Sequence, residues 1–142
     1  MIKTYKINDL NEFTYTGKIK DLKFDKKNQR FPLKPLVYFD LSSPIIIEKD
    51  VSFSNGVRVY THTHKFSRSD WRELGPVKKL DCPFIFKEGS FIGTNTLILF
   101  SCNYVGKYSV IGAGSVVLDS IPDYEIWVGN PAKKISDIKI IK

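Results

Sequence analysis

The chain has 142 residues and a net charge of +7, a length that suits a single domain. Hydrophobic residues make up 42% of it and aromatic residues 13%, enough for a packed core and too many for a disordered chain. The basic residues cluster in the N-terminal third and near the C-terminus. Neither cluster has the interleaved aromatic residues of a single-strand binder or the pattern of a recognition helix, which argues against a nucleic-acid partner.

Targeting and redox features are few. No apolar run approaches the roughly 20 residues that a membrane-spanning helix needs, and the polar N-terminus lacks the apolar core of a secretory signal. The two cysteines, Cys82 and Cys102, do not have the spacing of a CxxC motif. We therefore expect a cytoplasmic protein with reduced thiols and no membrane span.

Residues 1–34 show no repeat. Ile7, Leu10 and Phe13 are spaced to face one side of a short helix. The proline-containing stretch 31–35 is expected to end any regular secondary structure that precedes it. This segment is expected to be either a small cap over the end of the following domain or a loosely attached arm.

From residue 35 onward, apolar residues recur every six positions. An α-helix would alternate spacings of three and four, and a single strand would alternate strictly. A fixed spacing of six fits a chain that makes three short straight sides per coil, with inward residues of successive coils stacked. The large inward residues would be Leu41, Ile47, Phe53 and Val59, then Phe86, Ile92 and Ile98, and, after a one-residue insertion at Tyr104, Val105, Ile111 and Val117. Their companions would be Ile45, Val51 and Val57, and the small residues Ser90, Thr96, Cys102, Ser109 and Ser115.

The hexads predict an all-β fold, a single-stranded left-handed parallel β-helix of about three to four coils spanning residues 35–135. Residues 1–34 would form the N-terminal segment and residues 136–142 a short tail. Residues 62–85 break the period and are predicted to protrude as one long loop. Loops beyond about 12 residues are usually functional or disordered, and Trp71 and Leu74 give this loop something to pack.

Two stretches carry a resemblance to a known family. GAGSVV at 112–117 and GNPAK at 129–133 resemble the C-terminal signature of hexapeptide-repeat acyltransferases, most closely the maltose, galactoside and capsule or O-antigen sugar O-acetyltransferases. The similarity extends from Ile45 to Ile135. It implies a homotrimer that binds acetyl-CoA in the groove between neighbouring helices and transfers the acetyl group to a carbohydrate hydroxyl.

Two alternatives to sugar O-acetylation stay open. One is N-acetylation of an amino-sugar nucleotide, a variant within the same class of enzyme. The other is a non-catalytic trimeric scaffold or glycan-binding module.

The chemistry requires a general base that takes the proton of the attacking hydroxyl, and histidine suits this role near neutral pH. Both histidines of the chain, His62 and His64, lie where the repeat stops and the loop begins. The resemblance places the catalytic histidine at His64. His62, two residues earlier and on the same face of an extended strand, is the second candidate. A zinc site of the His-x-His type would need a third ligand, so we expect no metal.

A histidine base needs an acceptor that fixes its tautomer. Asp70 and Glu73 in the loop are the preferred candidates, with Asp40 or a backbone carbonyl as alternatives, although loop carboxylates are as often simply solvated. Trp71 is a candidate for stacking on the acceptor sugar or for pinning the loop to the coil. Asp40 is also a candidate for acceptor binding.

Contacts to acetyl-CoA are expected mainly from the backbone of small residues along a coil edge, namely Gly93, Thr94, Gly112 and Ala113. Phe91 stands where the family often has a tryptophan beside the pantetheine arm. The family often has a Thr-Lys pair where this chain has Leu118 and Asp119, which removes one phosphate partner and adds a repulsive charge. Lys133 and Lys134 remain as candidates for the phosphates, with help from Lys107.

Overall fold

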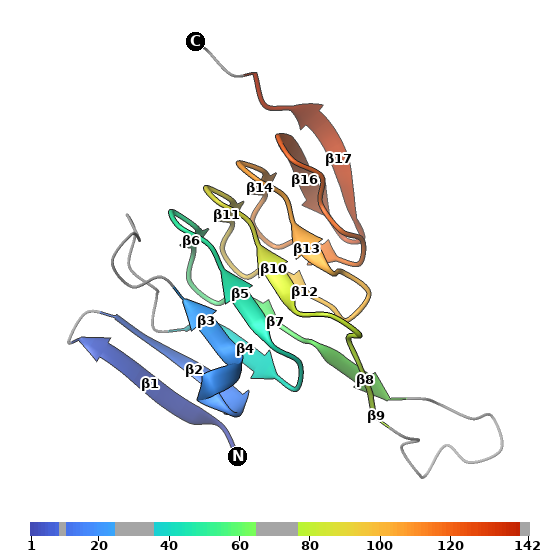
Figure 1. The fold of residues 1–142 in the computed structure, drawn as a ribbon. Helices are drawn as coiled ribbons and strands as arrows, with labels where there is room; N and C mark the ends of the chain where they lie inside the picture. The colour runs from blue at the N-terminus through green and yellow to red at the C-terminus, as the bar shows by residue number, and fades with distance from the viewer. Residues whose placement is uncertain (9–10, 25–35, 65–76, 140–142) are drawn as a thin grey trace, which may run out of the picture.

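The computed structural model describes residues 1–8, 11–24, 36–64 and 77–139 (Figure 1). These ranges consist of strands, turns and one short 3₁₀ helix. Within them, no helix is long and apolar enough to cross a membrane.

Three parallel sheets form the three sides of a coil (Figure 1). We call them side A (β4, Tyr38–Leu41, with β7, β12 and β15), side B (β3, Leu22–Phe24, with β5, β10 and β13) and side C (β6, β11 and β14, with β16, Glu125–Gly129). Successive coils are β5 (Ile45–Ile47), β6 (Ser52–Phe53) and β7 (Arg58–Val59), then β10 (Phe84–Phe86), β11 (Phe91–Ile92) and β12 (Leu97–Ile98), then β13 (Tyr104–Val105), β14 (Val110–Ile111) and β15 (Val116–Val117). Each strand pairs in parallel with the strand one coil away. This topology confirms the three-sided parallel β-helix, whereas its left-handed sense and total number of coils stay predictions.

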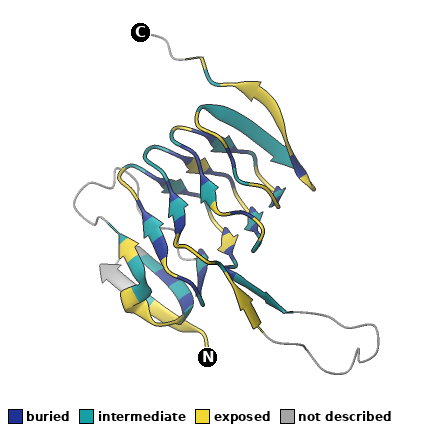
Figure 2. Ribbon diagram, turned by 45° about the vertical axis from the view of Figure 1, so that its right-hand side comes forward, coloured by how far each residue is buried: buried dark blue, intermediate teal, exposed yellow. Residues whose placement is uncertain are grey.

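The inward positions of the hexads form the core. Each residue assigned to an inward position by the spacing of six is at most 2% exposed. Buried residues recur along the strands of successive coils (Figure 2). Ile85 pairs with Tyr104, one residue beyond three complete hexads, which confirms the single insertion. The apolar residues removed from water at these positions supply the main stabilisation of the coils.

The N-terminal segment is a β-hairpin, so the helix predicted there is wrong. β1 (Lys3–Asn8) pairs antiparallel with β2 (Asn11–Gly17), and β2 pairs in parallel with β4 (Tyr38–Leu41) on side A. Phe13 and Tyr15 alternate along β2 and are both buried, with the Phe13 ring edge-on to Phe39 at 5.3 Å between centroids. The free edge of β4 offers hydrogen bonds that outweigh the weak helical spacing. After a 3₁₀ helix (η1, Ile19–Asp21), β3 (Leu22–Phe24) extends side B in the same way.

Two further hairpins depart from the coil. β8 (His62–His64) and β9 (Val77–Lys79) form a two-stranded antiparallel hairpin that leaves the body between β7 and β10 (Figure 1). It starts where the long loop was predicted, although residues 84 and 85 already belong to β10. At the other end, β16 (Glu125–Gly129) pairs antiparallel with β17 (Ala132–Asp137), which runs two residues past the predicted boundary at 135.

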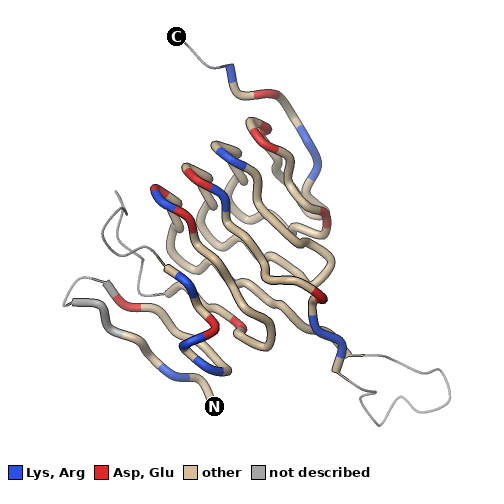
Figure 3. The backbone as a smooth tube through the Cα atoms, viewed as in Figure 1, with Lys and Arg blue, Asp and Glu red and all other residues tan. Residues whose placement is uncertain are grey.

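Charged residues gather at the corner between sides B and C (Figure 3). The Glu88 carboxylate forms ion pairs with Nζ of Lys49 at 3.3 Å and with Nζ of Lys107 at 3.6 Å, from the coils on either side. It also accepts a hydrogen bond from the Tyr108 hydroxyl at 2.9 Å. Exposed ion pairs contribute little to stability, so this ladder aligns the coils more than it stabilises them.

Candidate active site

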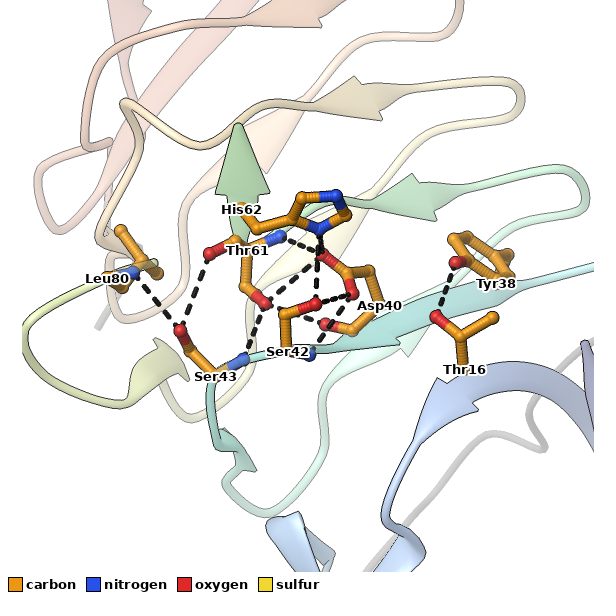
Figure 4. Close-up of polar contacts among 8 residues, drawn as sticks. All are labelled: Thr16, Tyr38, Asp40, Ser42, Ser43, Thr61, His62 and Leu80. Atoms are coloured by element: carbon orange, nitrogen blue, oxygen red, sulfur yellow. Dashed lines mark hydrogen bonds and ion pairs between the residues drawn. The ribbon is translucent and has the colours of Figure 1, made fainter. Parts of the chain in front are cut away.

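The candidate site lies at the corner between sides A and B, where the β8–β9 hairpin leaves the coil (Figure 4). Asp40 lies near the end of β4, and Ser42 and Ser43 form the turn that follows. One coil later, Thr61 and His62 occupy the same corner. Parallel stacking of β4 on β7 therefore brings a carboxylate and an imidazole together across 22 residues of sequence.

Asp40 is 1% exposed and its carboxylate is fully engaged (Figure 4). Oδ1 accepts hydrogen bonds from the backbone N–H of Ser42 at 3.1 Å and from its hydroxyl at 2.6 Å. Oδ2 accepts from the backbone N–H of Thr61 at 2.9 Å and lies 2.6 Å from Nδ1 of His62. Burial acts to raise the pKa of Asp40, but the hydrogen bonds from Ser42, His62 and Thr61 outweigh it and hold that pKa below its ordinary value. The carboxylate is therefore ionised.

The ionised carboxylate fixes the tautomer of His62. Because it can only accept, we assign the ring proton to Nδ1, which also lies 3.1 Å from the Ser42 hydroxyl. In the neutral ring, Nε2 is then the unprotonated nitrogen, and the side chain is 29% exposed. A histidine held in this way can take a proton from a group that approaches from solvent.

A second layer of hydrogen bonds fixes the hairpin to the coil. The Thr61 hydroxyl donates to the carbonyl oxygen of Asp40 at 2.8 Å and accepts from the backbone N–H of Ser43 at 2.9 Å. The Ser43 hydroxyl accepts from the backbone N–H of Leu80, just after β9, at 3.1 Å. Both legs of the hairpin are thus tied to the same corner, which fixes the position of His62.

His64 has a different environment from His62, although both lie in β8. The two rings meet edge-on with centroids 5.5 Å apart. Nδ1 of His64 is buried and has no hydrogen-bond partner among the described residues. The role of His64 as the base stays a prediction. Of the two histidines, only His62 has a carboxylate partner among the described residues. Asp70, Trp71 and Glu73 lie outside the described residues.

Comparison with known proteins finds relatives and structural neighbours among acetyltransferases. The chain is 31% identical over 121 residues to the galactoside O-acetyltransferase of Lactococcus lactis subsp. lactis (strain IL1403), which covers 80% of this chain and 56% of the relative. The fold matches a solved galactoside acetyltransferase in complex with coenzyme A, with a TM-score of 0.65 and 23% identity over 72% of this chain and 50% of that one. The chain is a relative of the hexapeptide-repeat acetyltransferases.

A second relative of this chain is an amino-sugar enzyme. The dTDP-3-amino-3,6-dideoxy-alpha-D-galactopyranose 3-N-acetyltransferase of Aneurinibacillus thermoaerophilus is 49% identical over 49 residues, which are 34% of this chain and 25% of the relative. The chain thus spans between a quarter and about half of these two curated relatives. No model of a protein family matches the sequence.

The residues predicted to contact acetyl-CoA lie on side C and at its corner with side A. Phe91 is 41% exposed on side C, and Thr94 and Ala113 are exposed at the corner. The two glycines are needed for coil stacking. A Cβ added at Gly93 would lie 2.6 Å from the backbone nitrogen of Ala113, and one added at Gly112 would lie 2.6 Å from the Val128 side chain.

The two candidate phosphate ligands are not equivalent. Nζ of Lys134 lies 2.7 Å from Asp137 and 2.9 Å from Glu125, and these two hydrogen bonds raise the pKa of Lys134. Lys133 is exposed and makes no ion pair with the described residues. Lys133 is therefore the freer of the two cations, while Lys107 is engaged by Glu88.

Sequence reasoning missed the residues that hold the pair together. It considered Asp40 as one of several acceptors and preferred the loop carboxylates, and it did not consider Ser42, Ser43 or Thr61. Short hydroxyl residues at a coil corner are common turn formers, so their composition gives no signal. The signal lies in the stacking register, which places Asp40 beside the start of β8.

Proposed function

We propose that this chain is an acetyl-CoA-dependent O-acetyltransferase that acts on a hydroxyl group of a sugar or glycan, with His62 as the general base. The observation that carries the proposal is the 2.6 Å contact between Nδ1 of a partly exposed histidine and a buried, ionised carboxylate. The galactoside O-acetyltransferase relative and the neighbour solved with coenzyme A support the donor and the class of acceptor.

The geometry supports the following roles for the residues. Acetyl-CoA supplies the acetyl group as a thioester. Nε2 of His62 accepts the proton of the attacking hydroxyl, and Asp40 balances the positive charge that develops on the ring. His62 then holds that proton for the sulfur of the departing thiol, which leaves the base unprotonated for the next turnover.

The exposed residues of side C fit a donor of this kind. Phe91 presents an apolar surface, Thr94 and Ala113 present backbone at the corner, and Lys133 offers an unpaired cation for a phosphate. Leu118 and Asp119 are both exposed and offer no replacement cation. The homotrimer, with a site shared between subunits, stays part of the proposal, and a molar mass from light scattering would test it.

N-acetylation is the second candidate, because the relative from Aneurinibacillus thermoaerophilus acts on an amino sugar. The same base would serve, since an amine also loses a proton as it is acylated. The two reactions differ in the bond that they form, an ester in one and an amide in the other.

The test is a thiol-release assay with acetyl-CoA and a panel of neutral, acidic, phosphorylated and amino sugars. We expect release with at least one sugar, and hydroxylamine should remove an acetyl ester from the product but leave an acetyl amide. Coenzyme A should also raise the melting temperature, because a ligand that binds only the folded state stabilises it. No release with any acceptor, together with no thermal shift, would contradict the proposal.

A further inference from the structure

The outer surface of side A carries a hollow beside the candidate active site. It has a volume of about 450 Å³, and its lining includes Thr14, Leu36, Tyr38, Arg58 and Tyr60. These residues come from the N-terminal hairpin, from β4 and the residues just before it, and from the segment that begins with β7. The hollow thus lies on the coils that also supply Asp40 and His62.

The hollow and His62 lie close together on the outer surface of the chain. Val59 and Thr61 are buried at 0% exposure, whereas Arg58 is exposed and Tyr60 and His62 are partly exposed. Arg58, Tyr60 and His62 therefore all lie on the outer surface, Arg58 on side A and His62 at the start of β8, just past the corner where β7 ends. At roughly 3.3 Å per residue, the four-residue separation keeps the backbone of Arg58 within about 13 Å of the backbone of His62. A ligand in the hollow can therefore reach the base.

Two tyrosines and one arginine give the hollow its chemistry. The rings of Tyr38 and Tyr60 lie 5.4 Å apart between centroids at an angle of 49°. The Tyr38 hydroxyl shares a 2.8 Å hydrogen bond with Thr16, which holds its ring in place (Figure 4). Arg58 makes no ion pair with any described residue, and its planar guanidinium matches the geometry of a carboxylate or a phosphate.

We infer that this hollow is an acceptor subsite for an anionic saccharide. One sugar ring lies on the rings of Tyr38 and Tyr60, as expected of a pocket that combines aromatic rings with polar side chains. Its carboxylate or phosphate pairs with Arg58, and the hydroxyl to be acetylated lies on the adjoining unit beside His62. A backbone separation of up to about 13 Å between Arg58 and His62 favours an acceptor longer than a single ring. This inference rests on the proposed function and names the class of acceptor.

Direct binding tests the inference without turnover. Calorimetry would compare a disaccharide containing a uronic acid, the same disaccharide with the carboxyl group reduced to an alcohol, and a disaccharide phosphate. Wild type should bind both charged disaccharides more tightly than the neutral one. The charged disaccharide with the higher affinity identifies the anion that the subsite prefers. Arg58→Gln should weaken charged ligands by about tenfold to a hundredfold, as expected for a hydrogen bond to a charged group, and leave the neutral ligand unchanged.

Matched variants separate the parts of the subsite. Lys23→Gln removes the same charge from the exposed surface of side B and should change none of the affinities. Tyr60→Ala should weaken charged and neutral disaccharides alike, while Tyr60→Phe should retain most of the affinity because it keeps the ring. In turnover, Arg58→Gln should raise KM for the anionic acceptor and leave kcat and the KM for acetyl-CoA unchanged.

Several outcomes would overturn the inference. Equal losses for charged and neutral ligands would remove the role of Arg58, and a rise confined to the KM for acetyl-CoA would assign the hollow to the donor. If Arg58→Gln changed the molar mass of the protein in solution, the hollow would instead belong to a contact between subunits.

Acetylation of neutral sugars without any preference for anions overturns the subsite but leaves the proposed function intact. Anion-selective binding without thiol release supports the subsite and contradicts the proposed reaction.

Discussion

The coils from Phe84 to Val117 and the corner from Asp40 to His64 are built in different ways. In the coils, equivalent residues recur every six positions, and each inward side chain packs on its counterparts in neighbouring coils. At the corner, each contact is made by a residue that has no counterpart in other coils. The repeat provides a rigid frame, and the departure from the repeat provides the candidate chemistry.

The two regions are also stabilised differently. Strands such as β11 and β12 pair with neighbours on both sides, whereas β8 pairs only with β9. An isolated two-stranded hairpin is marginally stable in water. The hydrogen bonds through Asp40, Thr61 and Ser43 therefore decide where His62 lies, and variants can test each region separately.

The largest expected effect is at the corner, on activity. His62→Ala should lower kcat by about 10²- to 10⁴-fold, the usual contribution of a general base, without lowering the melting temperature substantially. His64→Ala is the matched control, since it removes the same side chain two residues along β8. Steady-state thiol release and thermal unfolding of both variants would show the difference. Loss of activity in His64→Ala with activity retained in His62→Ala would move the base to the residue that the resemblance indicates.

The largest expected effect in the coils is on stability. Ile111→Ala should lower the free energy of unfolding by about 2–5 kcal/mol, because the side chain is fully buried and its neighbours cannot collapse into the gap. Val110→Ala, on the outward side of the same strand, should cost less than about 1 kcal/mol. Urea unfolding would measure both. Similar losses would show that the predicted inward and outward faces are not energetically distinct.

The difference between the two regions also explains what the sequence predicts. The core is predictable because every coil needs an apolar residue at the same inward position, and this requirement repeats every six residues in the sequence. The N-terminal hairpin is not, because β2 forms as it pairs with β4, and that non-local contact leaves only a weak local pattern.

The spacing of six does not predict the pairing of Asp40 with His62, and the reason is a shift in register. Counting in sixes from Leu41 leads to Val59 as its counterpart, whereas the structure pairs Phe39 with Val59. Two extra residues in the turn between β4 and β5 shift the register, so Leu41 is buried but is not the counterpart of Val59 that the spacing of six predicts. The shift decides which side chains meet at the corner, and composition carries no record of it.

Replacing the carboxylate should have an intermediate effect. Asp40→Asn should lower kcat by about 10- to 100-fold, the usual cost of losing a group that orients a functional histidine, because an amide can donate to Nδ1 and leave the proton on Nε2. The pH dependence of stability gives an independent readout. The folded-state pKa of Asp40 is lowered, so its stabilising contribution is present above the unfolded value near 3.9 and is lost as pH falls through the folded value. The melting temperatures of wild type and Asp40→Asn should therefore converge between neutral and acid pH, and a constant difference would contradict an ionised Asp40.

The smallest expected effect lies inside the coils, at one position of the hexad. Ser90 and Ser109 are both fully buried, but the Ser109 hydroxyl donates to the carbonyl oxygen of Gly106 at 2.7 Å, whereas the Ser90 hydroxyl has no partner among the described residues. Ser109→Ala should cost about 1 kcal/mol of unfolding free energy, and Ser90→Ala should range from no change to a gain of about 1 kcal/mol. Urea unfolding of the two variants measures the difference at constant residue type and burial. Equal losses would mean that Ser90 is hydrogen-bonded in solution, and the coils would then be as uniform in their polar contacts as they are in their apolar ones.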